Sequence, residues 1–70
     1  MSFGMFIFLC RLMAMEKQIG LVHEEKIYDA CKKFLLLNPD RVRNYFIGCY
    51  DFKVNEAIDL EIVLDLFWRY

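Results

Sequence analysis

The chain has 70 residues, of which 59% are hydrophobic and 17% aromatic, and its formal net charge is −1. This length allows one small domain, and the near-zero net charge argues against a nucleic-acid-binding protein, which needs a clustered basic excess. A domain of this size buries only about 60% of the surface that its unfolded chain exposes. The large apolar side chains therefore exceed what one chain can enclose, and we expect part of the apolar surface to meet a partner.

Residues 1–15 are almost wholly apolar, and Arg11 is the only charged residue among them. Helical spacing of the apolar side chains predicts a helix over residues 3–18, with Gly20 just beyond its end. An alternating pattern in the same segment leaves a buried strand as the alternative. The apolar run is shorter than the ~20 residues that span a bilayer, and it lacks the preceding basic residues of a signal peptide.

Methionines at positions 13 and 15 leave the origin of this segment open. If translation begins at Met13 or Met15, the preceding residues are an upstream extension of the native chain. If they are native, they join the core or, as an alternative, place the protein on a membrane surface.

Residues 22–37 carry apolar side chains at the i, i+3, i+4, i+7 and i+8 spacing of an amphipathic helix. Pro39 disfavours helical geometry at Asn38, which ends this helix and serves as the N-cap of the next one. The next helix is predicted over residues 39–50. Its apolar stripe consists of Val42, Tyr45, Phe46 and Cys49.

Residues 57–70 fit two patterns. Apolar and polar side chains alternate as in a strand, while at 100° per residue they form a broad apolar stripe opposite a narrow acidic one. The length of about fourteen residues, the good helix formers and Asn55 as an N-cap favour a helix. The strand alternative would pair residues 50–54 with residues 58–68 as a β-hairpin.

Together these elements predict an all-α fold, a compact bundle of three to four short helices in one domain over residues 1–70. The connections are short, so the helices should be antiparallel or orthogonal neighbours in one core. An α+β fold with the C-terminal hairpin is the alternative.

The three cysteines, Cys10, Cys31 and Cys49, are far apart in sequence and form no CxxC motif. An odd count without a signal peptide predicts reduced thiols in a cytoplasmic protein. Their spacing to His23 matches no common zinc pattern, so we expect neither a metal nor a cofactor. Cys31 and Cys49 lie on the apolar stripes of their predicted helices, which predicts that both are buried.

Residues 24–50 have the outline of a helix-turn-helix, and Arg41, Arg43 and Asn44 lie near the start of its second helix, where base-reading side chains occur. Acidic residues interleaved with them dilute the positive charge that DNA binding requires. A DNA-binding regulator is therefore an alternative interpretation.

Catalytic patterns are lacking in the sequence. It contains no Gly-rich phosphate loop and no paired Ser and His. His23 and Cys31 lie eight residues apart on one predicted helix, about 12 Å along its axis, too far for a nucleophile and its base. The sequence therefore predicts a non-enzymatic protein.

The apolar surplus and the acidic end together predict a self-associating protein-interaction module, such as a regulator, an inhibitor or an accessory subunit. Its acidic patch, Glu61 and Asp65, is predicted to stay free and to bind a second protein with a basic surface. The predicted homodimer interface consists of Phe3, Phe6, Leu60, Leu64, Phe67, Trp68 and Tyr70.

Overall fold

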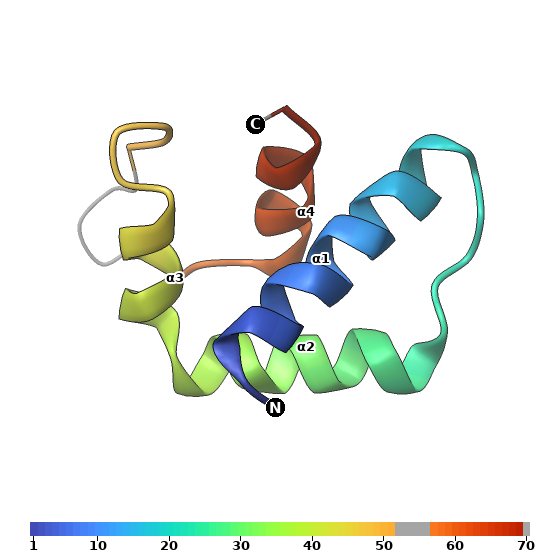
Figure 1. The fold of residues 1–70 in the computed structure, drawn as a ribbon, viewed down its shortest axis with the longest axis horizontal. Coiled ribbons are helices and arrows are strands. Elements are labelled where there is room, and N and C mark those ends of the chain that lie inside the picture. Colours follow the sequence, from blue (N-terminus) through green and yellow to red (C-terminus); the bar gives the residue numbers. More distant parts are fainter. Residues whose placement is uncertain (52–56, 70) are drawn as a thin grey trace.

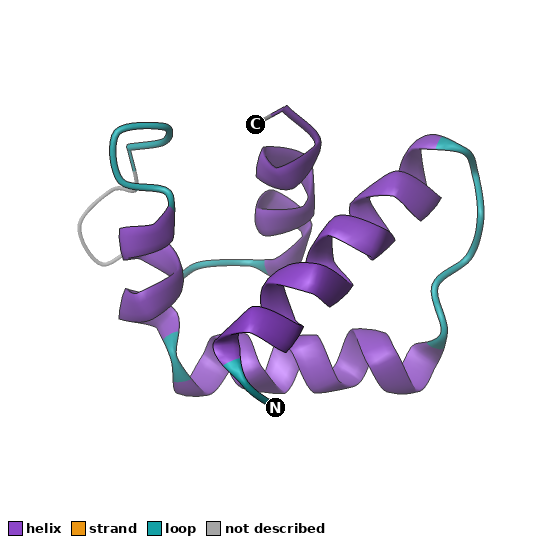
Figure 2. Ribbon diagram, viewed as in Figure 1, coloured by secondary structure: helices purple, strands orange, loops and turns teal. Residues whose placement is uncertain are grey.

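The computed structural model describes residues 1–51 and 57–69. Within these residues the chain forms four helices and no strand (Figure 2). The all-α prediction is confirmed, and the hairpin alternative is wrong because its second strand is helical. The helices are α1 (Phe3–Gln18), α2 (Glu25–Leu37), α3 (Pro39–Tyr45) and α4 (Leu60–Arg69).

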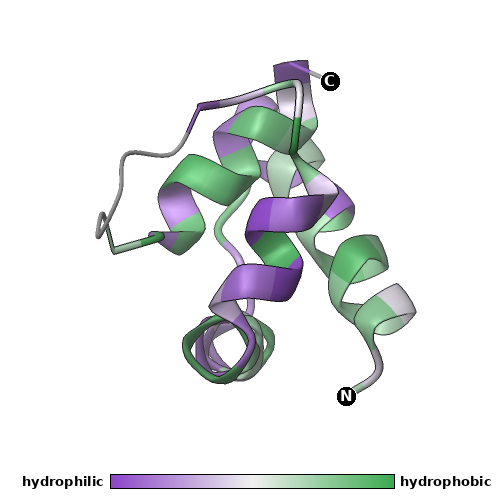
Figure 3. Ribbon diagram, turned by 90° about the vertical axis from the view of Figure 1, so that its left-hand side faces the viewer, coloured by the Kyte–Doolittle hydropathy of each residue, from purple (hydrophilic) through white to green (hydrophobic). Residues whose placement is uncertain are grey.

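Helix α1 forms an outer layer of the molecule. It crosses in front of α2 in Figure 1, while α3 and α4 stand above α2. Turned by 90°, the molecule shows α1 rising from the N-terminus along its right-hand side (Figure 3). Helix α1 packs against α2 and α4, with Phe6, Cys10, Met13 and Ala14 buried on the packed side.

Local signals at both ends of α1 explain where it begins and ends. The Oγ atom of Ser2 accepts a hydrogen bond from the backbone N–H of Met5 at 3.1 Å, which makes Ser2 the N-cap. Gly20 follows the C-cap with a φ of 78°, in the left-handed region that glycine adopts without strain. The predicted bounds of this helix are confirmed.

The α2–α3 junction works differently from the prediction. Asn38 occupies the N-cap position and Pro39 the first position of α3, as expected, but the Asn38 side chain makes no cap bond. Its Nδ2 atom instead donates to the backbone oxygen of Phe34 at 3.0 Å, and so satisfies a carbonyl at the end of α2. Helix α2 begins at Glu25, later than the predicted start at position 22.

Helix α3 is shorter than predicted. It ends at Tyr45 rather than near residue 50, and turns follow it. Gly48 lies in these turns with a φ of 84°, a conformation that a helix cannot contain. Cys49 is therefore exposed, and the prediction that it lies on a buried stripe is wrong.

Helix α4 begins later than predicted. Its first residue is Leu60, and the Oδ1 atom of Asp59 accepts a hydrogen bond from the N–H of Glu61 at 3.0 Å. This contact makes Asp59 the capping residue. The predicted cap, Asn55, lies outside the described residues.

One apolar core holds the helices together. Phe6 of α1 stacks on Phe34 of α2, with 4.6 Å between the ring centroids. The buried core side chains are Phe6, Cys10, Met13, Ala14, Cys31, Phe34, Leu35, Val42, Phe46, Leu60, Val63, Leu64 and Leu66.

A candidate interaction surface on the outer face of α1

Helix α1 has two apolar faces, of which only one is covered. Phe6, Cys10, Met13 and Ala14 point into the core. The opposite face carries five large apolar side chains that are 37–66% exposed. We call this set the outer stripe: Met5, Phe8, Leu12, Met15 and Ile19.

The outer stripe has the spacing of a coiled-coil seam. Its members follow one another at alternating steps of four and three residues, which is the a/d spacing of a heptad repeat. Side chains at these positions form one line along a helix. A second helix laid along this line would meet all of them.

A helix that is apolar on every side is normally buried on every side. Here the outer stripe presents roughly 500 Å² of apolar surface, if a large side chain offers about 200 Å² in full. This is in the upper part of the ~300–600 Å² range of the largest apolar patch on an ordinary monomer, and it is more than half of the ~800 Å² per partner of a stable interface. The hydropathy colouring shows the turns of α1 next to the N-terminus in green (Figure 3).

Charged side chains flank the outer stripe on both sides. On one side, Arg11 donates a hydrogen bond to the hydroxyl of Tyr45 at 3.0 Å, and its guanidinium lies 5.9 Å from the ring centroid of Phe67. On the other side, Oε1 of Glu16 lies 3.4 Å from Nδ1 of His23. An apolar strip with a polar rim is the usual layout of a protein interface.

A polar cluster near the C-terminal end of α1 links three helices. Nζ of Lys17 in α1 lies 2.8 Å from Oε2 of Glu61 in α4, and the Tyr28 hydroxyl of α2 donates to Oε1 at 2.9 Å. The Lys17 ammonium lowers the pKa of the Glu61 carboxyl, while burial and the Glu61 hydrogen bond raise the pKa of Tyr28 to about 12. His23 stacks on Tyr28 with 6.0 Å between the ring centroids. Each of these polar groups has a partner within the chain, so we interpret the cluster as a structural contact between the three helices.

The residues predicted for the homodimer interface are mostly inside the fold. Phe6, Leu60 and Leu64 are buried in the core of one chain, so they offer no surface to a second chain. Phe3 and Phe67 are half-buried against that core. Of the predicted set, Trp68 is 54% exposed, and Tyr70 lies outside the described residues.

The two predicted partner-binding acids are not free. Glu61 pairs with Lys17, and Asp65 pairs with Arg69 at 3.2 Å, one turn along α4. Both pairs are partly exposed. A basic partner would have to displace these cations, and binding of such a partner stays a prediction.

The basic residues of the helix-turn-helix outline are also engaged within the chain. The Arg41 guanidinium lies 4.5 Å from the ring centroid of Phe3, and Arg43 lies 3.0 Å from Asp40. Helix α3, which carries them together with Asn44, has only seven residues. It therefore offers a short surface for reading a major groove.

The cysteines have two different environments. Cys10 and Cys31 are buried in the core, and Cys49 is exposed. A hydrogen bond to Cys31, together with burial, holds the pKa of the Cys10 thiol above its usual range. In the part of the chain that the structure describes, no three His, Cys, Asp or Glu side chains come together as a metal site.

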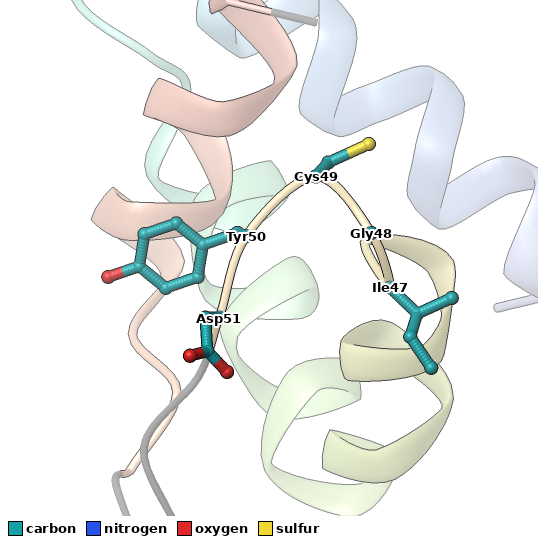
Figure 4. Close-up of a pocket in the computed structure, with 5 residues that line it drawn as sticks. All are labelled: Ile47, Gly48, Cys49, Tyr50 and Asp51. Atoms are coloured by element: carbon teal, nitrogen blue, oxygen red, sulfur yellow. The ribbon is translucent and has the colours of Figure 1, made fainter.

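A surface hollow lies beside the turns after α3, lined by Ile47, Gly48, Cys49, Tyr50 and Asp51 (Figure 4). In this view the side chains of Ile47 and Cys49 point to one side of the turn and that of Tyr50 to the other. A small-molecule site brings polar groups together over one point. These side chains diverge, so the hollow does not form such a site.

The comparisons with known proteins give no family. No protein-family model, no curated protein and no solved structure matches this chain. Across residues 1–51 and 57–69, no helix is both long enough and apolar enough to cross a membrane. The outer stripe is therefore the candidate site, and it rests on the geometry of this chain alone.

Proposed function

We propose that this protein is a non-enzymatic, self-associating interaction module and that the outer stripe of α1 is its binding surface. One observation carries the proposal: α1 is apolar on two opposite faces, and its own chain covers only one of them. Burial of the second face against another protein chain would remove a large apolar area from water. Such a protein acts as a regulator, inhibitor or accessory subunit by binding.

Sedimentation equilibrium of the full chain at micromolar concentrations tests the proposal. We expect the wild-type protein to self-associate. Phe8→Glu and Leu12→Glu each place a charge in the middle of the stripe, so each variant should be monomeric with unchanged helix content. Burying an unpaired carboxylate at an interface costs several kcal/mol.

Val22→Glu is the matched control. Val22 is 93% exposed and lies in the loop between α1 and α2, outside the stripe. The same substitution there should leave self-association unchanged. A wild-type protein that is monomeric, or a Leu12→Glu variant that associates like the wild type, would overturn the proposal.

A further inference from the structure

We infer that a second copy of this chain covers the outer stripe as a parallel, in-register partner, with Arg11 of each chain beside Glu16 of the other. This inference rests on the proposed self-association and adds the identity, direction and register of the partner helix. The observations behind it are the heptad spacing of the stripe, its area and the charges at its edges.

The heptad positions follow from the spacing. Met5, Leu12 and Ile19 take the a positions, and Phe8 and Met15 take the d positions. Arg11 directly precedes an a residue and is therefore at a g position, whereas Glu16 directly follows a d residue and is at an e position. Positions e and g lie on the two sides of the a/d seam. This agrees with the places of Arg11 and Glu16 on opposite sides of the outer stripe.

The charges select the parallel direction. In a parallel pair of helices, a g residue lies next to the e residue that is five positions later in the partner. Arg11 and Glu16 have this separation, so a parallel dimer forms two symmetry-related ion pairs. In an antiparallel pair centred on the same seam, g residues face g residues, and Arg11 would lie beside the partner's Arg11.

The contacts within one chain leave room for these pairs. Arg11 is exposed and donates to Tyr45 through one guanidinium nitrogen, and a guanidinium has five N–H donors. Glu16 contacts His23 through Oε1, while a carboxylate has two acceptor oxygens. Both residues can therefore keep their own-chain contacts and meet a partner.

A twofold axis along the seam also suits the fold. The covered face of α1 is on the opposite side from the outer stripe, so the bulk of each chain lies away from the seam. The same surface serves both copies, which is the isologous contact that closes as a dimer. In the dimer each stripe is covered by the other, so no stripe remains exposed for a third chain.

Cysteine crosslinking tests the direction and register. Phe8→Cys and Leu12→Cys are made separately in a Cys49→Ser background, in which Cys10 and Cys31 are buried. The full-length proteins are equilibrated with oxidised and reduced glutathione and analysed by intact mass. We expect each variant alone to form a covalent dimer, because equal positions face each other in a parallel, in-register pair.

An antiparallel dimer gives a different result. Position 8 then faces position 12 of the partner, so covalent dimers appear only when the two variants are mixed. That result, or a non-covalent dimer that forms no crosslink in any combination, overturns the inference and leaves the proposed self-association standing. A monomeric wild-type protein overturns both, and so does a monomer that binds vesicles of anionic phospholipid through the stripe.

Charge exchange provides a second readout that does not depend on cysteine. Arg11→Glu and Glu16→Arg should each raise the Kd of the dimer by roughly 3- to 10-fold, because each change breaks both ion pairs. The double variant restores the pairs with reversed sign and should return the Kd to within about 2-fold of the wild-type value. Lys33→Glu on the exposed surface of α2 is the control and should leave the Kd unchanged. If the loss of dimerisation free energy in the double variant equals the sum of the losses in the two single variants, the result contradicts the parallel pairing.

Discussion

Nζ of Lys17 lies 2.8 Å from Oε2 of Glu61, and this ion pair joins the last turn of α1 to the first turn of α4. The two residues are 44 positions apart in the sequence. Tyr28 of α2 donates to the other oxygen of the same carboxylate. One carboxylate thus links three helices at the end of the molecule where the outer stripe also ends.

Stability should depend on pH through this carboxylate. Lys17 lowers the pKa of Glu61, so its contribution is complete above the unfolded value of about 4.5 and is lost as the pH falls through the lower folded value. The Glu61 contact raises the pKa of Lys17, whose contribution is lost as the pH rises above 10.5. Since both side chains are about half exposed, we expect an effect of at most about 1 kcal/mol.

Urea unfolding of the wild type and Glu61→Gln between pH 3 and 7 measures the acid side. The variant should lose part of the pH dependence below 4.5, the unfolded value of Glu61. Glu25→Gln, an exposed carboxylate in the first turn of α2, is the control. Equal slopes for Glu61→Gln and the wild type would show that the ion pair does not form in solution.

The two faces of α1 should respond differently to the same substitution. Phe6 is fully buried and Phe8 is 62% exposed, only two residues away. Phe6→Ala leaves a cavity beside Phe34 and should cost about 3–5 kcal/mol, about half of the ~4–10 kcal/mol expected for 70 residues. Phe8→Ala should cost under about 1 kcal/mol in the folding of the monomer, and it should weaken self-association.

Chemical denaturation in a Leu12→Glu background separates these effects, because that background is expected to be monomeric. Matching losses of stability for Phe6→Ala and Phe8→Ala would mean that α1 does not dock by the face described here. Chemical denaturation also tests the upstream-extension alternative. A chain that begins at Met15 lacks Phe6, Cys10 and Met13 of the core, so it should not unfold cooperatively.

Apolar periodicity predicts the two middle helices, whereas residues 3–18 and 57–70 fit both a helix and a strand, and for the last segment its length and good helix formers favour the helix. The break before Pro39 could be predicted because proline disfavours helical geometry at the preceding residue. The ends of the helices were harder to predict, because several residues compete for each cap. Asn55 and Asp59 are both good N-caps, and the capping contact is made by Asp59. Glycine lowers helix propensity, but the sequence does not show that Gly48 adopts a positive φ and that Cys49 is exposed.

The sequence predicts that an apolar binding surface exists, but it does not show where on the chain this surface lies. The surplus of apolar side chains is visible in the sequence, and so is the four-three spacing of the outer stripe. However, both faces of α1 are equally apolar, so periodicity does not tell which face the other helices cover. The sequence therefore predicts an interface that contains Phe6 and not Phe8, whereas the structure buries Phe6 and exposes Phe8.

The cysteines should differ in reactivity. Native protein treated with iodoacetamide should gain one adduct, at Cys49, because the thiolate is the nucleophile and needs access to the reagent. Cys10 is buried and has a raised pKa, so its thiol should react only after unfolding. Mass spectrometry with and without denaturant counts the adducts, and Cys49→Ser should give none in the native state. Rapid reaction of two or three thiols in native protein would argue against the buried placement of Cys10 and Cys31.

Asp59 should act as the N-cap of α4. Asp59→Ala removes the acceptor for the Glu61 N–H and should cost about 1 kcal/mol. For a domain of 60–100 residues this corresponds to a fall in Tm of roughly 4–8 °C, which circular dichroism at 222 nm measures. Asp59→Asn keeps a side-chain oxygen and should retain most of the stability, whereas Asp51→Ala removes an exposed acid outside the described helices and should have little effect. If Asp59→Ala melts like the wild type, the contact between Asp59 and the N–H of Glu61 does not stabilise α4.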